Sequence, residues 1–228
     1  MTNAFRNLAL LSGLLFVTLI PAHAQSLWLE PDPVTPKAGE PVTVRLIQGD
    51  FFGGEEQRFI EPKVVAFQRL RKSGRQNLAR ADGTTPAASY NAGEDGVEIL
   101  ALTWKAGSAG FYCKSVQVVG DAETGHPLRY SELGQRLEIV PQTDPVVLAR
   151  EGGKLEVQVL FEREPLAGIR VDAMPKDDPI KGMVKAVTDE IGVASLDLNR
   201  AGAWLIQVSY KTPKARSRAT LYLQAGRP

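Results

Sequence analysis

Cys113 and His126 are the two side chains best suited to bind a transition metal. Thiolate sulfur and imidazole nitrogen are preferred ligands for such ions, and a site needs several of them converging in space. Beyond residue 24 the chain has one cysteine and one histidine. Cys113 lies in an apolar stretch typical of a strand, and His126 lies in the polar, turn-rich segment 120–127 that follows it. We name this pair as the candidate metal site; the alternative is a half-buried cysteine and a solvated loop histidine.

Two pairs of carboxylates offer oxygen ligands for hard cations. Glu94 and Asp95 precede Gly96, and Asp177 and Asp178 precede Pro179. Neither pair has the alternating spacing of a calcium-binding loop, and acidic residues beside glycine or proline are common in turns. We therefore expect both pairs to lie in ordinary turns.

Sequence signatures of catalysis are missing. The chain contains no Gly-x-Ser-x-Gly turn, no phosphate-binding glycine loop and no His-Glu-x-x-His helix. A hydrolase with two distant carboxylates remains an alternative, because the sequence contains 26 aspartate and glutamate residues. The sequence predicts a protein that is not an enzyme.

The charge balance argues against a nucleic-acid partner. The chain has 27 lysine and arginine residues against 26 acidic ones, and a nucleic-acid-binding protein usually has a basic excess on one face. Basic residues cluster at 69–75 and 211–218. We expect the first cluster to be a solvated loop after a strand, and the second to be a solvated hairpin loop between the last two strands.

Residues 1–24 are typical of a secretory signal peptide. Arg6 is followed by the apolar run 8–20 and by Ala22-His23-Ala24, a small-x-small cleavage site. The run is well short of the ~20 residues that cross a bilayer, and no second apolar run follows. The sequence therefore predicts an exported, soluble periplasmic protein that begins at Gln25. Its single cysteine allows no intramolecular disulfide.

The remaining residues form short alternating or continuous apolar stretches separated by glycine, proline and aspartate. No amphipathic helical stretch exceeds two turns. This rhythm is typical of antiparallel β-sandwiches. The expected strands are 42–47, 63–70, 97–104, 111–119 and 136–140 and, after a break, 155–161, 169–174, 183–187, 193–198, 204–210 and 219–224.

Pro141 and Pro145 mark the break between the two sets of strands. Proline fixes the backbone and removes a hydrogen-bond donor, so a strand is not expected to continue through this segment. The sequence predicts a signal peptide at 1–24, an N-terminal β-sandwich at 25–141 and a C-terminal β-sandwich at 143–228.

Three tryptophans, Trp28, Trp104 and Trp204, lie near the start, the middle and the end of the mature chain. Tryptophan buries a large apolar area. We interpret all three as structural residues that fill a core or the contact between the two domains.

Three segments resemble a known family. They are LWLEPDPVTPKAGEPVTVRLIQGDFFGGEE at 27–56, LEIVPQTDPVVLAREGGKLEVQVLFEREPLAG at 137–168 and TDEIGVASLDLNRAGAWLIQVSY at 188–210. The family comprises exported proteins of unknown function catalogued as a nickel-uptake substrate-specific region. The resemblance implies a divalent transition metal, nickel or cobalt, as ligand, and a membrane metal transporter or outer-membrane receptor as partner.

Residues 143–228 also resemble transthyretin-like and carboxypeptidase-regulatory modules. That resemblance concerns the fold of this domain and not its function. With the strand pattern and the proline break, the expected fold is an all-β chain of two tandem antiparallel β-sandwiches of Ig-like or transthyretin-like type. Gln25, Ser26 and Tyr210 stand where members of the nickel-uptake family commonly carry histidine. We therefore expect weak metal binding.

Taken together, the residues and the resemblances predict a non-enzymatic periplasmic accessory binding protein linked to transition-metal uptake. The alternative is a structural or protein-docking module of the cell envelope. The two differ in what they require, because metal handling needs converging donor atoms and docking needs an accessible surface or sheet edge.

Overall fold

The computed structural model describes residues 25–78, 83–128 and 131–226. The expected signal peptide, residues 1–24, lies outside the described residues. No helix in the described part of the chain has the length and apolarity needed to cross a membrane.

Strands dominate both halves of the chain, as the alternating apolar pattern predicts. The first half contains β1 (Ser26–Asp32), β2 (Pro41–Asp50), β3 (Gly53–Glu56), the 3-10 helix η1 (Glu61–Lys63), β4 (Val64–Arg71), β5 (Gly74–Asn77), β6 (Ala88–Asn91), β7 (Gly96–Ala106), β8 (Ala109–Val119) and β9 (Leu137–Pro141). The second half contains α1 (Pro145–Glu151), β10 (Gly153–Phe161), β11 (Glu164–Pro165), β12 (Arg170–Pro175), β13 (Val184–Val187), β14 (Val193–Leu198), β15 (Gly202–Lys211) and β16 (Arg216–Ala225).

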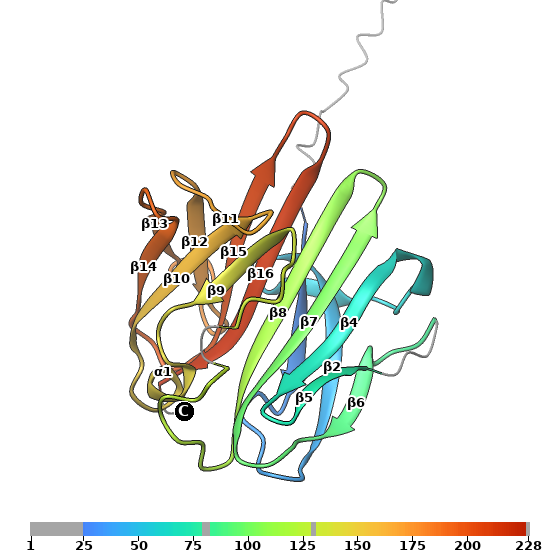
Figure 1. Ribbon diagram of the computed structural model, residues 1–228, viewed down its shortest axis with the longest axis vertical. Coiled ribbons are helices and arrows are strands. Elements are labelled where there is room, and N and C mark those ends of the chain that lie inside the picture. Colours follow the sequence, from blue (N-terminus) through green and yellow to red (C-terminus); the bar gives the residue numbers. More distant parts are fainter. Residues whose placement is uncertain (1–24, 79–82, 129–130, 227–228) are drawn as a thin grey trace, which may run out of the picture.

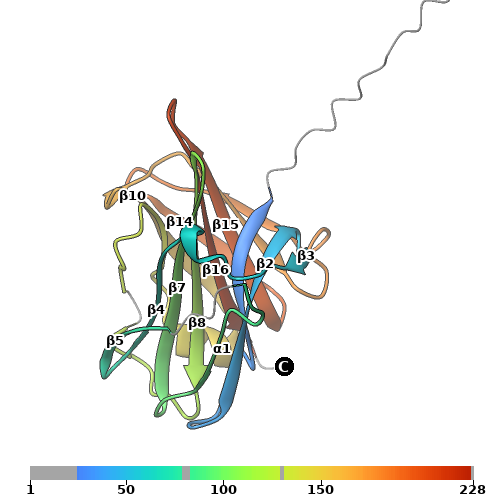
Figure 2. The same ribbon diagram turned by 90° about the vertical axis from the view of Figure 1, so that its right-hand side faces the viewer.

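The strands form three layers. A central sheet has the order β13-β12-β15-β16-β8-β7-β4-β5. The first outer sheet contains β1, β2, β3 and β6, and the second outer sheet contains β9, β10, β11 and β14. Figure 2 shows the central sheet between β2 and β3 on one side and β10 and β14 on the other. The chain is therefore an all-β sandwich protein, as expected.

Alternate side chains of β8 pack into two different hydrophobic cores, one on each face of the central sheet. Cys113 packs in the hydrophobic cluster under the first outer sheet, with residues such as Leu29. Tyr112 and Val116 point to the opposite face and pack with residues of the second outer sheet, such as Val157. Because side chains alternate along a strand, each face of the central sheet buries its own apolar set.

The central sheet runs through both halves of the chain. β16 pairs with β8 in parallel, from Arg216 beside Ala109 to Tyr222 beside Ser115, and Figure 1 shows the two strands side by side. All other strand pairs are antiparallel in the described residues. The sandwich formed by the first outer sheet is thus joined edge to edge to the sandwich formed by the second.

The segment between the two prolines is a compact connection. Asp144 caps α1, where its Oδ1 accepts a hydrogen bond from the amide of Val146 at 2.9 Å. Pro145 occupies the start of the helix, where a missing N–H has no cost. β9, which the sequence places in domain 25–141, pairs with β10 of the second half. The boundary at 141–143 stays a prediction about which segments fold on their own.

The eleven expected strands are all present within a few residues of their expected ends. The strands that the pattern did not predict are β1, β3, β5, β6 and β11. β3 (GGEE) and β5 (GRQN) are fully exposed and have no apolar alternation, so only pairing with a neighbour defines them. The hairpin expected near 211–218 is confirmed between β15 and β16, but its loop is shorter, at 212–215, because residues 211 and 216–218 belong to the paired strands.

Candidate functional site

Cys113 has a structural position in the core. It is buried, and its Sγ donates a hydrogen bond to the carbonyl oxygen of Leu27 at 3.1 Å. Burial raises the pKa of the thiol to about 12, an effect that a hydrogen bond with Thr220 opposes. The thiol is therefore protonated at neutral pH, and a protonated buried thiol is a poor metal ligand.

His126 is also buried, where the sequence left a solvated loop histidine as the alternative. Its Nδ1 accepts a hydrogen bond from the amide of Leu128 at 3.2 Å. Its Nε2 lies against Gly96, 2.9 Å from the position that a Cβ there would take. Burial and the charge of Lys72 lower the pKa of His126, and Asp144 opposes this shift. The absence of a side chain at residue 96 makes room for the ring.

The structure does not bring Cys113 and His126 together. Cys113 pairs with Leu102 on β7, whereas His126 lies beside Gly96, six residues away on the same strand. At ~3.3 Å per residue this corresponds to roughly 20 Å. No group of three or more His, Cys, Asp or Glu side chains among the described residues is placed to hold a metal ion.

The two carboxylate pairs differ in their surroundings. Glu94 and Asp95 line a cavity of about 260 Å³ with His126 and two basic residues. Asp177 and Asp178 instead form ion pairs with Arg200 at 3.2 and 3.5 Å.

The three tryptophans are buried. Trp28 donates to Glu30 at 3.3 Å and Trp204 donates to the carbonyl oxygen of Arg200 at 3.0 Å. Trp104 contacts the ring of Phe59 edge-on. Pro141 is buried at the end of β9, and Pro145 is buried at the start of α1. All five are placed as parts of the packed interior.

The described residues also form a groove that sequence reasoning did not predict. Two cavities of about 410 and 200 Å³ share the lining residues Lys105, Tyr112 and Arg136. We call the larger one the sheet cavity, the smaller one the tip cavity, and the two together the cationic groove. Its basic lining residues are Arg75, Lys105, Arg136, Lys214 and Arg216, and no aspartate or glutamate from the described ranges lines it.

Two hairpins build the tip cavity. Because β8 and β16 pair in parallel, the β7–β8 turn lies beside the β15–β16 turn, and the amide of Arg216 donates to the carbonyl oxygen of Ser108 at 3.3 Å. Figure 1 shows both hairpins extending at the same end of the molecule. This pairing brings Lys105 close to Lys214 and Arg216, which are distant in sequence.

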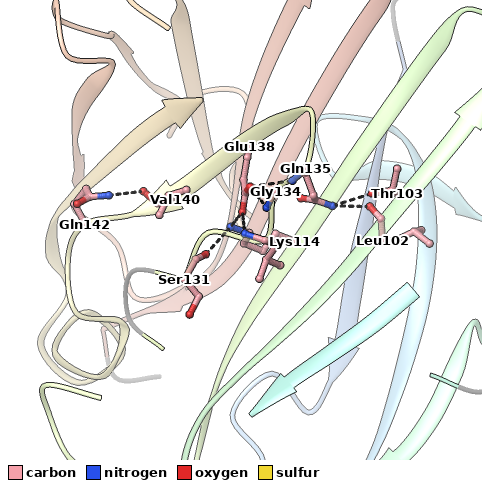
Figure 3. A network of polar contacts seen from close by, with 10 residues as sticks. Leu102, Thr103, Lys114, Ser131, Gly134, Gln135, Glu138, Val140 and Gln142 are labelled. Atoms are coloured by element: carbon pink, nitrogen blue, oxygen red, sulfur yellow. Dashed lines mark hydrogen bonds and ion pairs between the residues drawn. The ribbon is translucent and has the colours of Figure 1, made fainter. Parts of the chain in front are cut away.

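A buried ion pair holds one wall of the sheet cavity in place (Figure 3). Lys114 and Glu138 are almost fully buried and their Nζ and Oε1 lie 2.7 Å apart. The same carboxylate accepts hydrogen bonds from the amides of Leu133 at 2.6 Å, Gly134 at 2.9 Å and Gln135 at 3.0 Å. A buried pair is tolerated when its remaining hydrogen bonds are satisfied. Here they fix the loop that forms the wall.

Further hydrogen bonds tie this loop to the floor of the cavity. Lys114 Nζ donates to the carbonyl oxygen of Ser131 at 3.3 Å. The side-chain amide of Gln135 donates to the carbonyl oxygen of Leu102 at 3.0 Å and to Thr103 Oγ1 at 3.4 Å. Desolvation lowers the pKa of Lys114, and the charge of Glu138 opposes that shift. The wall is therefore anchored on both β7 and β8.

The cations of the groove are largely unpaired. Arg136 binds Glu162 at 2.8 Å, and both side chains are exposed. In the described part of the chain no carboxylate lies within 4.0 Å of the charged groups of Lys105, Lys214 or Arg216. Like charges held together without counter-charges create a positive potential that attracts anions.

Tyr112 lies where the two cavities meet. Burial raises the pKa of its hydroxyl, opposed by a hydrogen bond with Ser217 and by the charge of Arg136. The hydroxyl is thus neutral and can donate a hydrogen bond. A Cβ on Gly110 would lie 2.6 Å from it, so glycine makes room for this hydroxyl.

Some residues of the cationic groove belong to the two basic clusters that the sequence shows. Cluster 211–218 supplies Lys214 and Arg216, and cluster 69–75 supplies Arg75. We expected both clusters to be solvated loops, which is wrong for Arg69: that side chain is buried and binds Glu98 at 2.9 Å. Lys105 and Arg136 are isolated in sequence, so no local pattern connects them with either cluster.

Comparisons with known proteins add little about function. The sequence profile described as a domain of unknown function (DUF4198) matches residues 105–212, a little under half of the chain. No curated protein matches the chain. The description of the profile names neither nickel uptake nor a transthyretin-like module.

Several solved β-structures are similar over most of their length. The D0-D1 domain of Intimin is 13% identical and covers 87% of this chain and 97% of that one, with a TM-score of 0.25. Two fibronectin type-III domains of chicken tenascin are 12% identical over 86% and 97%, with a TM-score of 0.26. Domains NIE-MG1 of α2-macroglobulin from Escherichia coli are 11% identical over 85% and 95%, also at 0.26. Identities and TM-scores this low imply nothing about ligand or partner.

Proposed function

We propose that this protein is a non-enzymatic docking module of the cell envelope that binds an anionic partner in its cationic groove. The observation that carries the proposal is the lining of the groove, which among the described residues has five basic side chains and no acidic one. The whole chain has a net charge of only +1, so the positive charge of the groove comes from its local arrangement of side chains. Such a surface speeds encounter with anions and rejects cations.

The chemistry of the lining favours binding over catalysis. Histidine and carboxylate side chains are the commonest general bases in enzymes, and a serine or lysine nucleophile usually needs such a base beside it. No histidine or carboxylate side chain is among the described residues that line the groove. Its wall is held by the buried Lys114–Glu138 pair, and a rigid wall lowers the entropy cost of binding. The expected export signal would place this site in the periplasm, beside envelope components such as transporters and receptors.

Charge reversal in the groove tests the proposal. Lys105→Glu with Arg216→Glu should weaken binding of labelled dextran sulfate, a generic polyanion, by at least about tenfold at low salt. Lys154→Glu with Lys185→Glu is the matched control, because these exposed lysines lie outside the groove and the net charge changes equally. Fluorescence anisotropy measures both. Equal losses in the two variants, or no binding by the wild-type protein, would contradict the proposal.

A role in nickel or cobalt uptake is the second candidate, and its support is the family resemblance. His126 and Cys113 lie far apart, and each already has a hydrogen-bond partner. We therefore expect the metal-free protein to bind nickel weakly in isothermal titration calorimetry. Sub-micromolar binding that disappears in His126→Ala would reverse this expectation and make His126 the anchor of a metal site.

A further inference from the structure

The two cavities of the cationic groove differ in chemistry, and that difference indicates which anion fits. The tip cavity is lined by Lys105, Arg136, Lys214 and Arg216, together with the side chains of Tyr112 and Ser217. Two guanidinium groups, of which that of Arg136 also binds Glu162, lie here with two ammonium groups and three hydroxyl-bearing residues around a volume of about 200 Å³, a setting that suits a compact anion with several oxygen atoms. Arginine forms two parallel hydrogen bonds with phosphate as it does with carboxylate, but a phosphate group offers more oxygen atoms to the other donors that line this cavity.

The sheet cavity has apolar lining residues among its polar ones, which the tip cavity has only as alanine and glycine. Val65, Ala66, Ala101 and Leu133 are among its lining residues, and its volume of about 410 Å³ lies in the range of small-molecule sites. The side chain of Val65 is 55% exposed, one of few large apolar side chains so exposed in the described residues. An apolar ligand group would remove this surface from water.

A β-bulge places Val65 in that position. The register between β4 and β7 shifts at this point, because Val64 pairs with Trp104 and Ala66 pairs with Thr103, which leaves Val65 without a partner. Val64 and Phe67 both pack under the first outer sheet, so the two residues between them, Val65 and Ala66, both line the sheet cavity. Bulges of this kind reorient side chains near binding sites.

We infer that the ligand of the cationic groove is a phosphate-bearing amphiphile, with its phosphate group in the tip cavity and its apolar chain along the sheet cavity. This inference rests on the proposed function and names the class of its anionic ligand. Tyr112 and Arg136 line both cavities, so the phosphate and the start of the chain meet at these residues. A phospholipid headgroup and a free phosphate share the same phosphate chemistry, and only the amphiphile also uses Val65.

Four probes separate the two contributions: inorganic phosphate, glycerol 3-phosphate, dodecanoyl lysophosphatidate below its micelle concentration, and monododecanoylglycerol. Isothermal titration with the purified protein should show lysophosphatidate binding at least about tenfold more tightly than glycerol 3-phosphate, because the chain buries apolar surface. Lysophosphatidate should also bind at least about tenfold more tightly than monododecanoylglycerol, because Arg216 and its neighbours bind the phosphate group that the neutral lipid lacks.

Two variants assign each contribution to its cavity. Val65→Thr should reduce the advantage of lysophosphatidate over glycerol 3-phosphate several-fold and leave glycerol 3-phosphate binding unchanged. Arg216→Gln should weaken both phosphate compounds several-fold and leave the neutral lipid unchanged. Val187→Thr and Lys185→Gln on β13, an edge strand of the central sheet, are the matched controls, since both side chains are exposed and neither lines the groove. Circular dichroism verifies that each variant is folded.

Equal affinity for glycerol 3-phosphate and lysophosphatidate would overturn the inference, because a headgroup or free phosphate would then suffice. Equal affinity for all four probes would overturn it as well. If dextran sulfate still binds and depends on Lys105 and Arg216 in either case, the docking function stands and only the ligand class is wrong. If the control variant Lys154→Glu with Lys185→Glu lost as much dextran sulfate binding as the groove variant, the proposed function itself would be wrong.

Discussion

Glu138 shows how a single buried side chain can order a binding surface. Its carboxylate binds the ammonium group of Lys114 and three successive backbone amides, so the loop ahead of β9 is fixed to the central sheet. Arg69 and Glu98 form a second buried pair on the other face, where Arg69 also lies over the ring of Tyr90 at 4.1 Å. Both pairs join residues that are 24 to 29 positions apart, so local sequence gave no indication of either.

Removal of one partner from a buried pair leaves the other charge without compensation. Glu138→Ala should therefore lower the free energy of unfolding by about 3 to 5 kcal/mol. Glu162→Ala is the control, because it breaks the exposed ion pair with Arg136 and should cost no more than about 1 kcal/mol. Urea denaturation measures both. A loss below about 1 kcal/mol in Glu138→Ala would mean that the loop does not depend on this carboxylate.

Ser115 is the one side chain in the described residues with a buried polar atom that lacks a hydrogen-bond partner. An unsatisfied buried hydroxyl costs about 1 to 3 kcal/mol. Ser115→Ala removes that oxygen and should leave the free energy of unfolding unchanged or raise it by about 1 kcal/mol. Thr220→Ala is the comparison, because its hydroxyl donates to Leu27 at 2.8 Å and its removal should destabilise the protein. If Ser115→Ala lowered the free energy of unfolding by more than about 1 kcal/mol, the Ser115 hydroxyl would have a hydrogen-bond partner in the folded protein.

His126 should make stability depend on pH. Its pKa in the folded protein lies below the ordinary value of 6.5, because burial disfavours the charged ring. Just below pH 6.5 the unfolded chain then binds more protons than the folded one, so acid favours unfolding. The unfolding free energy should fall as pH decreases through 6.5 and level off below the folded pKa. The variant His126→Asn should lack this part of the profile, and an identical profile in the two proteins would exclude His126 as its source.

At the scale of elements, α1 depends on one capping residue. Asp144 accepts from Val146 through Oδ1, and its Oδ2 accepts from the amide of Gly125 at 2.5 Å. Asp144→Ala should lower the free energy of unfolding by about 1 to 2 kcal/mol, because helix and neighbouring loop both lose an acceptor. Asp144→Asn keeps a capping oxygen and should lose less. Equal stability of the Ala variant and the wild type in urea would show that packing of Val146 and Leu148 alone holds the helix.

At the scale of the whole molecule, the central sheet decides how separable the two sandwiches are. β9 pairs with β10, and the cluster around Trp28 contains Met174, Leu205 and Tyr222 from the second half. A fragment that starts at residue 134 keeps β9, whereas one that starts at residue 143 loses it. We expect the longer fragment to unfold at a higher urea concentration. A cooperative transition in fragment 143–228, equal to that of the longer one, would support the boundary expected from the prolines.

The amino-acid sequence by itself determined the fold class and most strands. Alternation of apolar side chains is a local property, so strands such as β10 and β15 were predictable within two residues of their ends. Strands such as β3 and β5 were not, because their exposed residues carry no alternation and only hydrogen bonds to a neighbour define them.

Only the tertiary structure decided where the candidate site lies. Lys105, Arg136 and Arg216 belong to three different segments, and the parallel pairing of β8 with β16 brings two of them together. Parallel strands must be joined by a long connection, so their pairing leaves no mark in any short stretch of sequence. The antiparallel pairing of β7 with β8 places Cys113 far from His126 and separates the residues that the sequence had offered as a metal site. A binding surface made by long-range pairing is fixed by the packed molecule, because no local pattern encodes the charge that it gathers.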